Sequence, residues 1–517
     1  MSEILFHYQK VDPTTWVYLS SLLMIGLYFK FGRFWSVRNL DLILLILLAP
    51  GLLIAQYGSE MRAGARRVAA WEADHGEADG EEPATGADPA SAESEALMPL
   101  SEPQSSPAGA MPEESPPTLA ERAARSAVPS EEDAREPPAP GGSPASPDAL
   151  ASSVRIERLG FLWLYAVAAV WLVRLLLDPT MVRRPLLEPN LTTGGLIFIG
   201  ISLFVFLMAN VWASQRFQAR PTEIPTGPES LVAQENGTGA EDVARRGPGY
   251  ALLNLVPSIP TMPLVPEGVT VSPQQRTYAI AAKVIAVLCH LAVVLGIVAI
   301  GYWHFGNTKT GAGVAALYLM LPYTAQMTGY IDHVIPAALL VWAILCYRRP
   351  LTSGMLLGVA TGLVYYPLFL LPLWVSFYWR RGLMRFAIGV SATLMAMAIG
   401  LALIPHASYW QNLQQMFGLW PPQMEGLQGI WGLGWNPVYR IPVLAAFVAL
   451  SGTLALWPPQ KNLGTLLSCS AAVMVATQFW HGYGGGLYIG WYLPLTLLTV
   501  FRPNLEDRVA LAVLGEG

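Results

Sequence analysis

The chain has 517 residues, of which 53% are hydrophobic and only 13% are charged. Soluble domains carry about a quarter of charged residues, so this composition excludes an ordinary soluble protein and predicts an integral membrane protein. The formal net charge is -5, and the acidic residues gather in one polar segment, which gives no support to nucleic-acid binding.

Apolar runs that approach the length of a bilayer crossing recur along the chain. A helix needs about 20 apolar residues to cross about 30 Å of hydrocarbon, and its backbone must satisfy its own hydrogen bonds there. We therefore expect an all-α integral membrane protein with about 11–13 transmembrane helices. The runs lie near 14–30, 39–57, 159–177, 194–213, 278–303, 312–330, 333–347, 354–379, 386–404, 440–457, 463–480 and 485–501.

The run Gly354–Trp379 differs from the others because Pro367 and Pro372 interrupt it. Basic residues flank both of its ends, namely Arg348, Arg349, Arg380, Arg381 and Arg385. Since Lys and Arg concentrate on the cytoplasmic side of a membrane, both ends should face the cytoplasm. The sequence predicts a tight hairpin of two short helices with Tyr365, Tyr366 and Pro367 at its tip.

The distribution of Lys and Arg also predicts the orientation of the whole chain. With Lys30 and Arg33 placed inside, most other basic residues near the spans fall inside as well. The short loops on the other side, around 328–332, 364–367, 405–438 and 480–484, contain no Lys or Arg. We expect the N-terminus outside, the C-terminus inside, and a bacterial inner (cytoplasmic) membrane, because no eukaryotic sorting signal is present.

Two long polar segments divide the chain into predicted regions. Residues 58–157 are rich in Ala, Pro, Ser, Gly and Glu and predict a disordered insertion, because they cannot bury enough apolar surface to offset the entropy of ordering. Residues 214–277 predict an outer loop that ends in a segment along the membrane surface. The remaining regions are a two-span module at 1–57, two further spans at 158–213, and a multispan core at 278–517.

Aromatic and hydrogen-bonding side chains collect in the predicted outer loops. Rings stack on the apolar faces of sugars while amides and carboxylates bind hydroxyls, so such a rim suits a sugar or a lipid headgroup. The alternative is the interfacial belt of Trp and Tyr that membrane proteins carry in general. The candidate substrate-binding residues are His333, Tyr365, Tyr366, His406, Trp410, Glu425 and His481.

Asp332 and His333 form an ionisable pair at the mouth of a predicted span. Such a pair costs free energy unless it meets water or a partner, so Asp332 is a candidate general acid or base, although a solvated loop pair is an equal alternative. His333, His406 and His481 would supply three histidine ligands, but no local ligand pattern such as HExxH is present. We therefore assign no metal ligands, and a divalent metal stays one possible cofactor.

The stretch HFGNTKTGAGVAALYLMLPYTAQMTGYIDHVIPAALLVWAILCYRRPLTSGMLLGVATGLVYYPLFLLPLWVSFYWRRG resembles the GT-C superfamily of membrane glycosyltransferases, particularly its mannosyltransferase-like branch. The resemblance covers about residues 276–501. Gly354, Gly358 and Gly362 match the small face of the family's glycine-rich helix, and Tyr366 and Pro367 match its tip. Leu371, Pro372 and Leu373 match the segment that returns across the membrane after this tip, and GWYLPLTLL resembles a late span of the family.

The resemblance implies a GT-C-like core that transfers a sugar from a polyprenyl-phosphate donor at the outer (periplasmic) face, with membrane lipid as its surroundings. The catalytic carboxylate of such enzymes usually lies in the first large outer loop, where Glu223 and Asp242 are candidates, and Asp332 is a third. At the tip, where the family often carries Lys for the lipid phosphate, this chain has Val364 or Tyr365.

Two other classes of function fit the same pattern. A transporter or flippase of a lipid-like solute would use helices broken near the middle of the bilayer, as Gly354–Trp379 is predicted to be. A non-catalytic membrane scaffold would use residues 58–157 to recruit partners. The donor, the acceptor and the oligomeric state do not follow from the sequence.

Overall fold

The computed structural model describes residues 12–76, 147–181, 188–213, 273–402 and 427–503, together with Tyr409, Trp410, Leu413 and Met424. Over these residues the regular structure is helical, and the β contact is an isolated bridge between Gln428 and Tyr483. Seven helices in this part of the chain are long and apolar enough to cross a membrane. The predicted all-α class and the membrane character are therefore confirmed.

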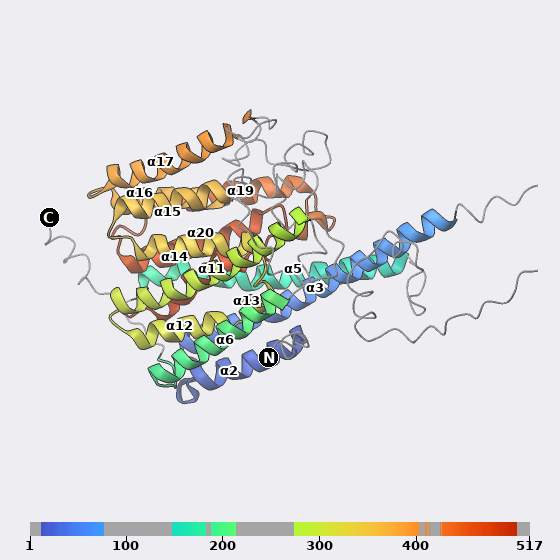
Figure 1. Ribbon diagram of the computed structural model, residues 1–517, viewed down its shortest axis with the longest axis horizontal. Helices are drawn as coiled ribbons and strands as arrows, with labels where there is room; N and C mark the ends of the chain where they lie inside the picture. The colour runs from blue at the N-terminus through green and yellow to red at the C-terminus, as the bar shows by residue number, and fades with distance from the viewer. Residues whose placement is uncertain are drawn as a thin grey trace, which may run out of the picture. The chain divides into compact units, whose positions relative to one another are not determined.

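The chain divides into two compact units. The smaller one is residues 61–151 with 266–270, and its described part is the end of one helix and the start of the next. All contacts discussed below lie in the larger unit, in which the helices run side by side (Figure 1).

The N-terminal part of the chain, up to residue 213, contributes four helices to the described structure. They are α2 (Pro13–Tyr28), α3 (Val37–Gly76), α5 (Pro147–Leu177) and α6 (Thr193–Ala213), with short 3-10 turns η1 (Phe31–Arg33) and η2 (Asp178–Thr180) between them. The helices α3 and α5 extend into the segment 58–157 from both sides. The rest of that segment, 77–146, lies outside the described residues, as does most of the predicted outer loop 214–277.

The following helices are shorter and more often interrupted. They are α11 (Pro273–Trp303), α12 (Thr308–Met320), α13 (Pro322–Gln326), α14 (Ile331–Leu345), α15 (Pro350–Leu363), η6 (Tyr366–Leu370), α16 (Leu371–Tyr378) and α17 (Leu383–Ala402). The predicted run 312–330 is not one helix, because Leu321 is extended before Pro322 and separates α12 from α13. A residue before proline disfavours the helical conformation, which explains the break.

The C-terminal part places one helix at the centre of the unit. It comprises η7 (Gly429–Gly432), η8 (Pro437–Tyr439), α19 (Arg440–Leu456), α20 (Leu463–Trp480), η9 (Ile489–Trp491) and α21 (Leu493–Phe501). Of the apolar spans, α20 is 94% buried over Leu463–Trp480, whereas α17 is only 17% buried over Leu383–Gly400. A helix that is buried all round is a core helix, and one with an exposed apolar face is a lipid-facing helix.

The predicted hairpin over Gly354–Trp379 is present. The Tyr378 hydroxyl at the end of α16 donates to the carbonyl of Tyr347, just before α15, at 2.6 Å. Gly382 packs against Pro350 at the same end. The chain therefore leaves and returns at one end, with Tyr365 and Tyr366 at the turn.

Glycines let α15 and α17 approach at backbone contact. A Cβ on Gly354 would collide with the carbonyl oxygen of Phe386, and one on Gly389 would collide with that of Leu351. Small residues at helix contacts are the usual device for close packing in membranes, where no hydrophobic drive brings helices together. The glycine-rich face predicted for this helix thus has a partner, α17.

Because successive helices reverse direction, the loops gather at two ends of the unit. We call one the basic end, defined by loops 29–36, 346–349, 379–382 and 457–462, and the other the aromatic end, defined by loops 327–330, 364–365 and 481–488. Contacts tie the basic end together, such as Ser376 Oγ to the Ala455 carbonyl at 2.5 Å. The two ends differ in chemistry, since the named loops of the aromatic end contain no Lys or Arg.

A buried ion-pair network closes the basic end. Arg174 donates to Asp41 at 2.9 and 3.0 Å and to Asp178 at 3.2 Å. Asp178 also accepts from Arg502 at 2.6 Å. The network joins α3, α5 and the residue after α21, so these charged residues connect segments that are far apart in the sequence.

Candidate functional site

The candidate site is a set of aromatic and histidine side chains at the aromatic end. His333 stacks on Tyr488 with ring centroids 4.4 Å apart, and His481 contacts the same Tyr488 at 4.5 Å. Tyr366 lies 4.7 Å from His481 and 5.1 Å from Trp491. We call the whole set the aromatic–histidine cluster, which consists of Tyr323, Tyr330, His333, Tyr365, Tyr366, Trp480, His481, Tyr488 and Trp491.

Interrupted helices bring these side chains together. The break before α13 places Tyr323, and the start of α14 places His333 in its first turn. The hairpin turn places Tyr366 in η6. After α20 ends, Gly484 and Gly486 adopt positive φ values of 74° and 95°, a conformation that side chains disfavour, and this turn carries the chain back to Tyr488.

Hydrogen bonds hold the segments of the cluster in register. The Tyr323 hydroxyl and Nδ1 of His333 are 2.5 Å apart. Nε1 of Trp491 donates to the backbone carbonyl of Asp332 at 2.9 Å. A Cβ on Gly490 would lie 2.8 Å from the carbonyl oxygen of His333, so α14 and η9 meet at the closest distance that glycine permits.

A buried cation borders the cluster. Arg440, the first residue of α19, is 5% exposed, and its Nε donates to the Trp480 carbonyl at 2.7 Å. Its guanidinium lies 5.8 Å from the centre of the Trp480 ring, within the range of a cation–π contact. The charge of Arg440 also acts on His481 and Tyr365. Arg440 therefore supplies a positive charge at the border of a cluster whose own loops contain no Lys or Arg.

His481 presents a buried hydrogen-bond donor. It follows α20 directly and is fully buried. Burial lowers the pKa of His481 well below its ordinary range, and the positive charges of Arg440 and His333 lower it further. Nδ1 accepts the backbone N–H of Tyr483 at 3.1 Å, so the proton of the neutral ring is assigned to Nε2. Among the described residues, that Nε2 has no hydrogen-bond partner.

Two other buried polar groups near the aromatic end also lack a hydrogen-bond partner among the described residues. They are the indole N–H of Trp480 and the hydroxyl of Tyr165. The Tyr165 ring packs on Phe479 of α20 with centroids 5.3 Å apart. Buried donors without a partner are rare in proteins because each costs about 1–3 kcal/mol. A polar group bound beside them would recover that free energy.

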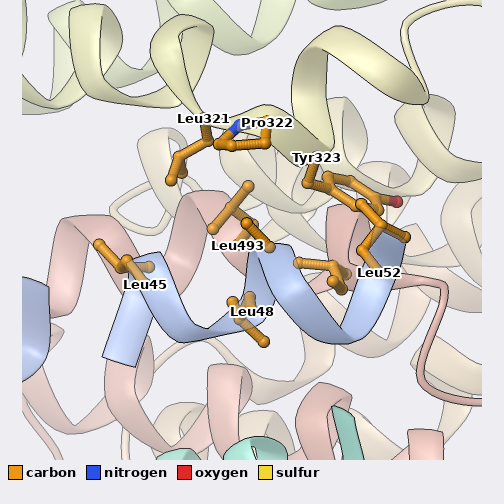
Figure 2. A pocket seen from close by; sticks show the side chains of 9 residues that line it. Leu45, Leu48, Leu52, Leu321, Pro322, Tyr323 and Leu493 are labelled. Atoms are coloured by element: carbon orange, nitrogen blue, oxygen red, sulfur yellow. The ribbon is translucent and has the colours of Figure 1, made fainter. Parts of the chain in front are cut away.

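A small apolar pocket adjoins the cluster. Its walls are side chains of α3, of the α12–α13 break and of the segment around α21, namely Leu45, Leu48, Ala49, Leu52, Leu321, Pro322, Tyr323, Ile489 and Leu493. Figure 2 shows the Tyr323 ring at this pocket with its hydroxyl at the far end of the ring. Because that hydroxyl contacts His333, Tyr323 connects the apolar pocket to the polar cluster.

Four of the predicted binding residues meet in this cluster, namely His333, Tyr365, Tyr366 and His481. Asp332 lies beside them, partly buried at the start of α14, and the charge of its carboxylate acts on Tyr323. Trp410 is 71% exposed and contacts Tyr409, with no contact to the cluster among those the structure describes. Glu223, Asp242, His406 and Glu425 lie outside the described residues.

Sequence reasoning missed Arg440, Tyr323 and Tyr488. Arg440 is the first residue of a predicted span, and the available signal was that this cation directly follows the predicted outer loop 405–438. In the described part of the chain, no three His, Cys, Asp or Glu side chains gather as a metal site would require.

No protein-family model, curated protein or solved structure matches the chain.

Proposed function

We propose that this protein is a GT-C-like membrane glycosyltransferase, which moves a sugar from a polyprenyl-phosphate donor to an acceptor at the outer (periplasmic) face of a bacterial inner membrane. The observation that carries the proposal is the aromatic–histidine cluster beside the buried Arg440, at one end of apolar helices. A polyprenyl-phosphate sugar offers a ring, an anion and an apolar chain, and this region offers a matching surface for each.

Three neighbouring parts of the site would divide the donor between them. The rings of Tyr365, Tyr366 and Trp480 suit the apolar face of a sugar. The guanidinium of Arg440 and the Nε2–H of His481 suit phosphate oxygens, because a charge-assisted hydrogen bond is about twice as strong as a neutral one. The apolar side chains around Tyr323 suit contact with the apolar chain, and Arg440 would take the place of the lysine that the family often carries at the hairpin tip.

Asp332 is the proposed general base. Its carboxylate would accept the proton of the acceptor hydroxyl while the hydroxyl oxygen forms a bond to the anomeric carbon of the sugar. The bond from that carbon to the phosphate oxygen would break, and polyprenyl phosphate would leave with the electron pair. The cluster would contribute by holding donor and acceptor in line.

The test separates binding from turnover. The purified protein is given a panel of polyprenyl-phosphate sugars, and both the dissociation constant and product formation are measured for Asp332→Asn, Arg440→Lys and Trp410→Ala. We expect Asp332→Asn to bind the donor normally without turnover, and Arg440→Lys to bind it at least tenfold more weakly. Trp410→Ala is the matched control on an exposed ring and should resemble the wild type.

Two results would contradict the proposal. One is full turnover by Asp332→Asn, which would remove the base assignment. The other is failure of the folded wild-type protein to bind any polyprenyl phosphate, with or without a sugar, which would remove the substrate class.

A second candidate is a flippase for a lipid-like solute, and a specific feature favours it. Both the α12–α13 break and the η6 break interrupt apolar helices at the aromatic end. Broken helices with a binding site between them are a recurring transporter design. Proteoliposomes loaded with a fluorescent polyprenyl phosphate would distinguish the two, because a flippase moves the lipid between leaflets without forming any glycosylated product.

A further inference from the structure

The loop between α2 and α3 presents exposed aromatic side chains in a fixed conformation. Asn39, which is fully buried, donates from Nδ2 to the carbonyls of Lys30, Arg33 and Phe34 at 3.0–3.2 Å. Its Oδ1 accepts the backbone N–H of Lys30 at 3.2 Å. The buried Asn39 amide therefore fixes the backbone conformation of the loop, and the exposed side chains of the loop have defined positions.

The displayed residues are large and apolar. Phe31 is 73% exposed and Trp35 is 81% exposed, while Phe29 is buried and contacts Phe31 and Phe34 at 5.1 and 5.4 Å. Phe34 in turn contacts Trp35 at 5.4 Å. Packing on Phe29 anchors this row of rings to the helical unit. Exposed aromatic surface of this kind costs free energy in water and gains it in a membrane interface.

Cations predominate around this loop, although the exposed Glu188 carboxylate lies near Arg38. Lys30 and Arg33 are exposed within it, and the Lys30 ammonium donates to Asn190 Oδ1 at 2.5 Å. The loops 346–349 and 379–382 of the same end add four arginines. None of these three loops contains Asp or Glu. A surface that combines exposed rings with cations is complementary to an anionic lipid headgroup, because the rings enter the interface while the cations meet phosphate.

The position of loop 29–36 along the chain is also consistent with binding a lipid headgroup. Val37, one residue after the loop, is the first residue of an apolar span that is long enough to cross the membrane. The rings therefore stand where the span enters the bilayer, at the depth where Trp and Phe are stable and lipid phosphates lie.

We propose that the loop 29–36 is a lipid-anchoring site that binds anionic phospholipid headgroups of the adjacent leaflet through Arg33, with Phe31, Phe34 and Trp35 inserted beside it. This inference does not depend on the proposed glycosyl transfer. It predicts that the protein retains anionic phospholipid in preference to zwitterionic phospholipid.

The test uses the full chain in mixed micelles of phosphatidylglycerol and phosphatidylcholine at equal concentration, with native mass spectrometry to count the retained lipids. The wild type should retain phosphatidylglycerol preferentially. Arg33→Gln should lower that preference roughly fivefold, as expected for about 1 kcal/mol per cation near an anionic surface, and Trp35→Ala should lower retention of both lipids.

Lys461→Gln is the control, because Lys461 is at the same end but its ammonium donates to the Pro458 carbonyl at 2.7 Å. It should leave the preference unchanged. Equal retention of the two lipids by the wild type, or an equal loss in Lys461→Gln and Arg33→Gln, would overturn the assignment. Since both Arg33 and Trp35 are exposed, their variants should keep the melting temperature of the wild type, and that measurement shows that any loss of lipid is not a loss of fold.

Discussion

Arg502 Nη2 and Asp178 Oδ2 are 2.6 Å apart although 324 positions separate them in the sequence. Asp178 directly follows α5, and Arg502 directly follows α21, so this contact fastens the last described helix to the N-terminal helices. Both side chains are almost fully buried, with exposures of 0% and 6%. Arg174 completes the network by pairing Asp178 with Asp41 of α3.

The first prediction concerns this network. Arg502→Met should destabilise the protein by about 3–5 kcal/mol, because it leaves Asp178 as a buried charge with one partner fewer. The melting temperature in detergent measures the loss. Arg385→Gln, at an exposed arginine, is the control and should melt like the wild type. If both variants melt at the same temperature, the contact contributes nothing to stability.

The second prediction concerns the contact of α15 and α17. Gly354→Val should destabilise the protein by about 1–3 kcal/mol, because its side chain would collide with the carbonyl of Phe386. A Cβ on Gly452 of α19 would meet nothing within 4 Å, so Gly452→Val is the matched control. Thermal melting in detergent compares the two, and a smaller loss for Gly354→Val than for Gly452→Val would contradict the close packing.

The third prediction concerns Asn39. Asn39→Ala removes the four hydrogen bonds that hold loop 29–36, so this loop should open locally. Trypsin cleaves after Lys30 and Arg33, and cleavage there should become at least tenfold faster. Asn436→Ala, which removes a single cap to Val438 at the other end, serves as control. An unchanged cleavage rate in Asn39→Ala would mean that other contacts fix the loop.

The fourth prediction is a pH dependence. His481 has a folded-state pKa well below its ordinary value of about 6.5. The unfolded chain therefore binds a proton that the folded chain does not, and stability is full above about pH 6.5 and falls as the pH falls below it. Burial of the ring lowers its pKa most, and the nearby charges of Arg440 and His333 lower it further. The other groups around the ring are Tyr366, Tyr483, Tyr488 and Trp491.

Melting temperatures between pH 7.5 and pH 5 check this dependence. His481→Gln should flatten the loss at acidic pH without abolishing it, because burial also lowers the pKa of His304. His304→Gln measures that second contribution. A slope that is identical in the wild type and in His481→Gln would show that His481 is protonated, or solvated, in the folded protein.

The positions of most helices could be predicted from the sequence, because long apolar runs are the signal of membrane helices. The hairpin of α15 and α16 followed from Pro367 and the flanking arginines. What could not be predicted were the partners of each segment. The break at Leu321 was hidden inside an apolar run, and the pairing of Arg174 with Asp41 spans 133 positions.

Part of the candidate site could also be predicted, because the sequence shows which polar residues lie in the loops between apolar runs. His333, Tyr366 and His481 were identified as polar residues in predicted outer loops. Loops on the same side of a membrane lie at the same end of the helices and can contact one another. Arg440 was assigned to a span because apolar residues follow it. Only the fold reveals that its guanidinium turns back to the Trp480 ring and carbonyl.

The backbone contact of α15 and α17 has a mechanical consequence for the site. The backbones of α15 and α17 touch at Gly354 and Gly389, and the Thr393 side chain fills the contact at Gly358, so we expect the two helices to move together. Tyr365 and Tyr366 follow α15 by only two and three residues. A displacement of these two rings that moves α15 should therefore also move α17, which is largely exposed along its apolar length.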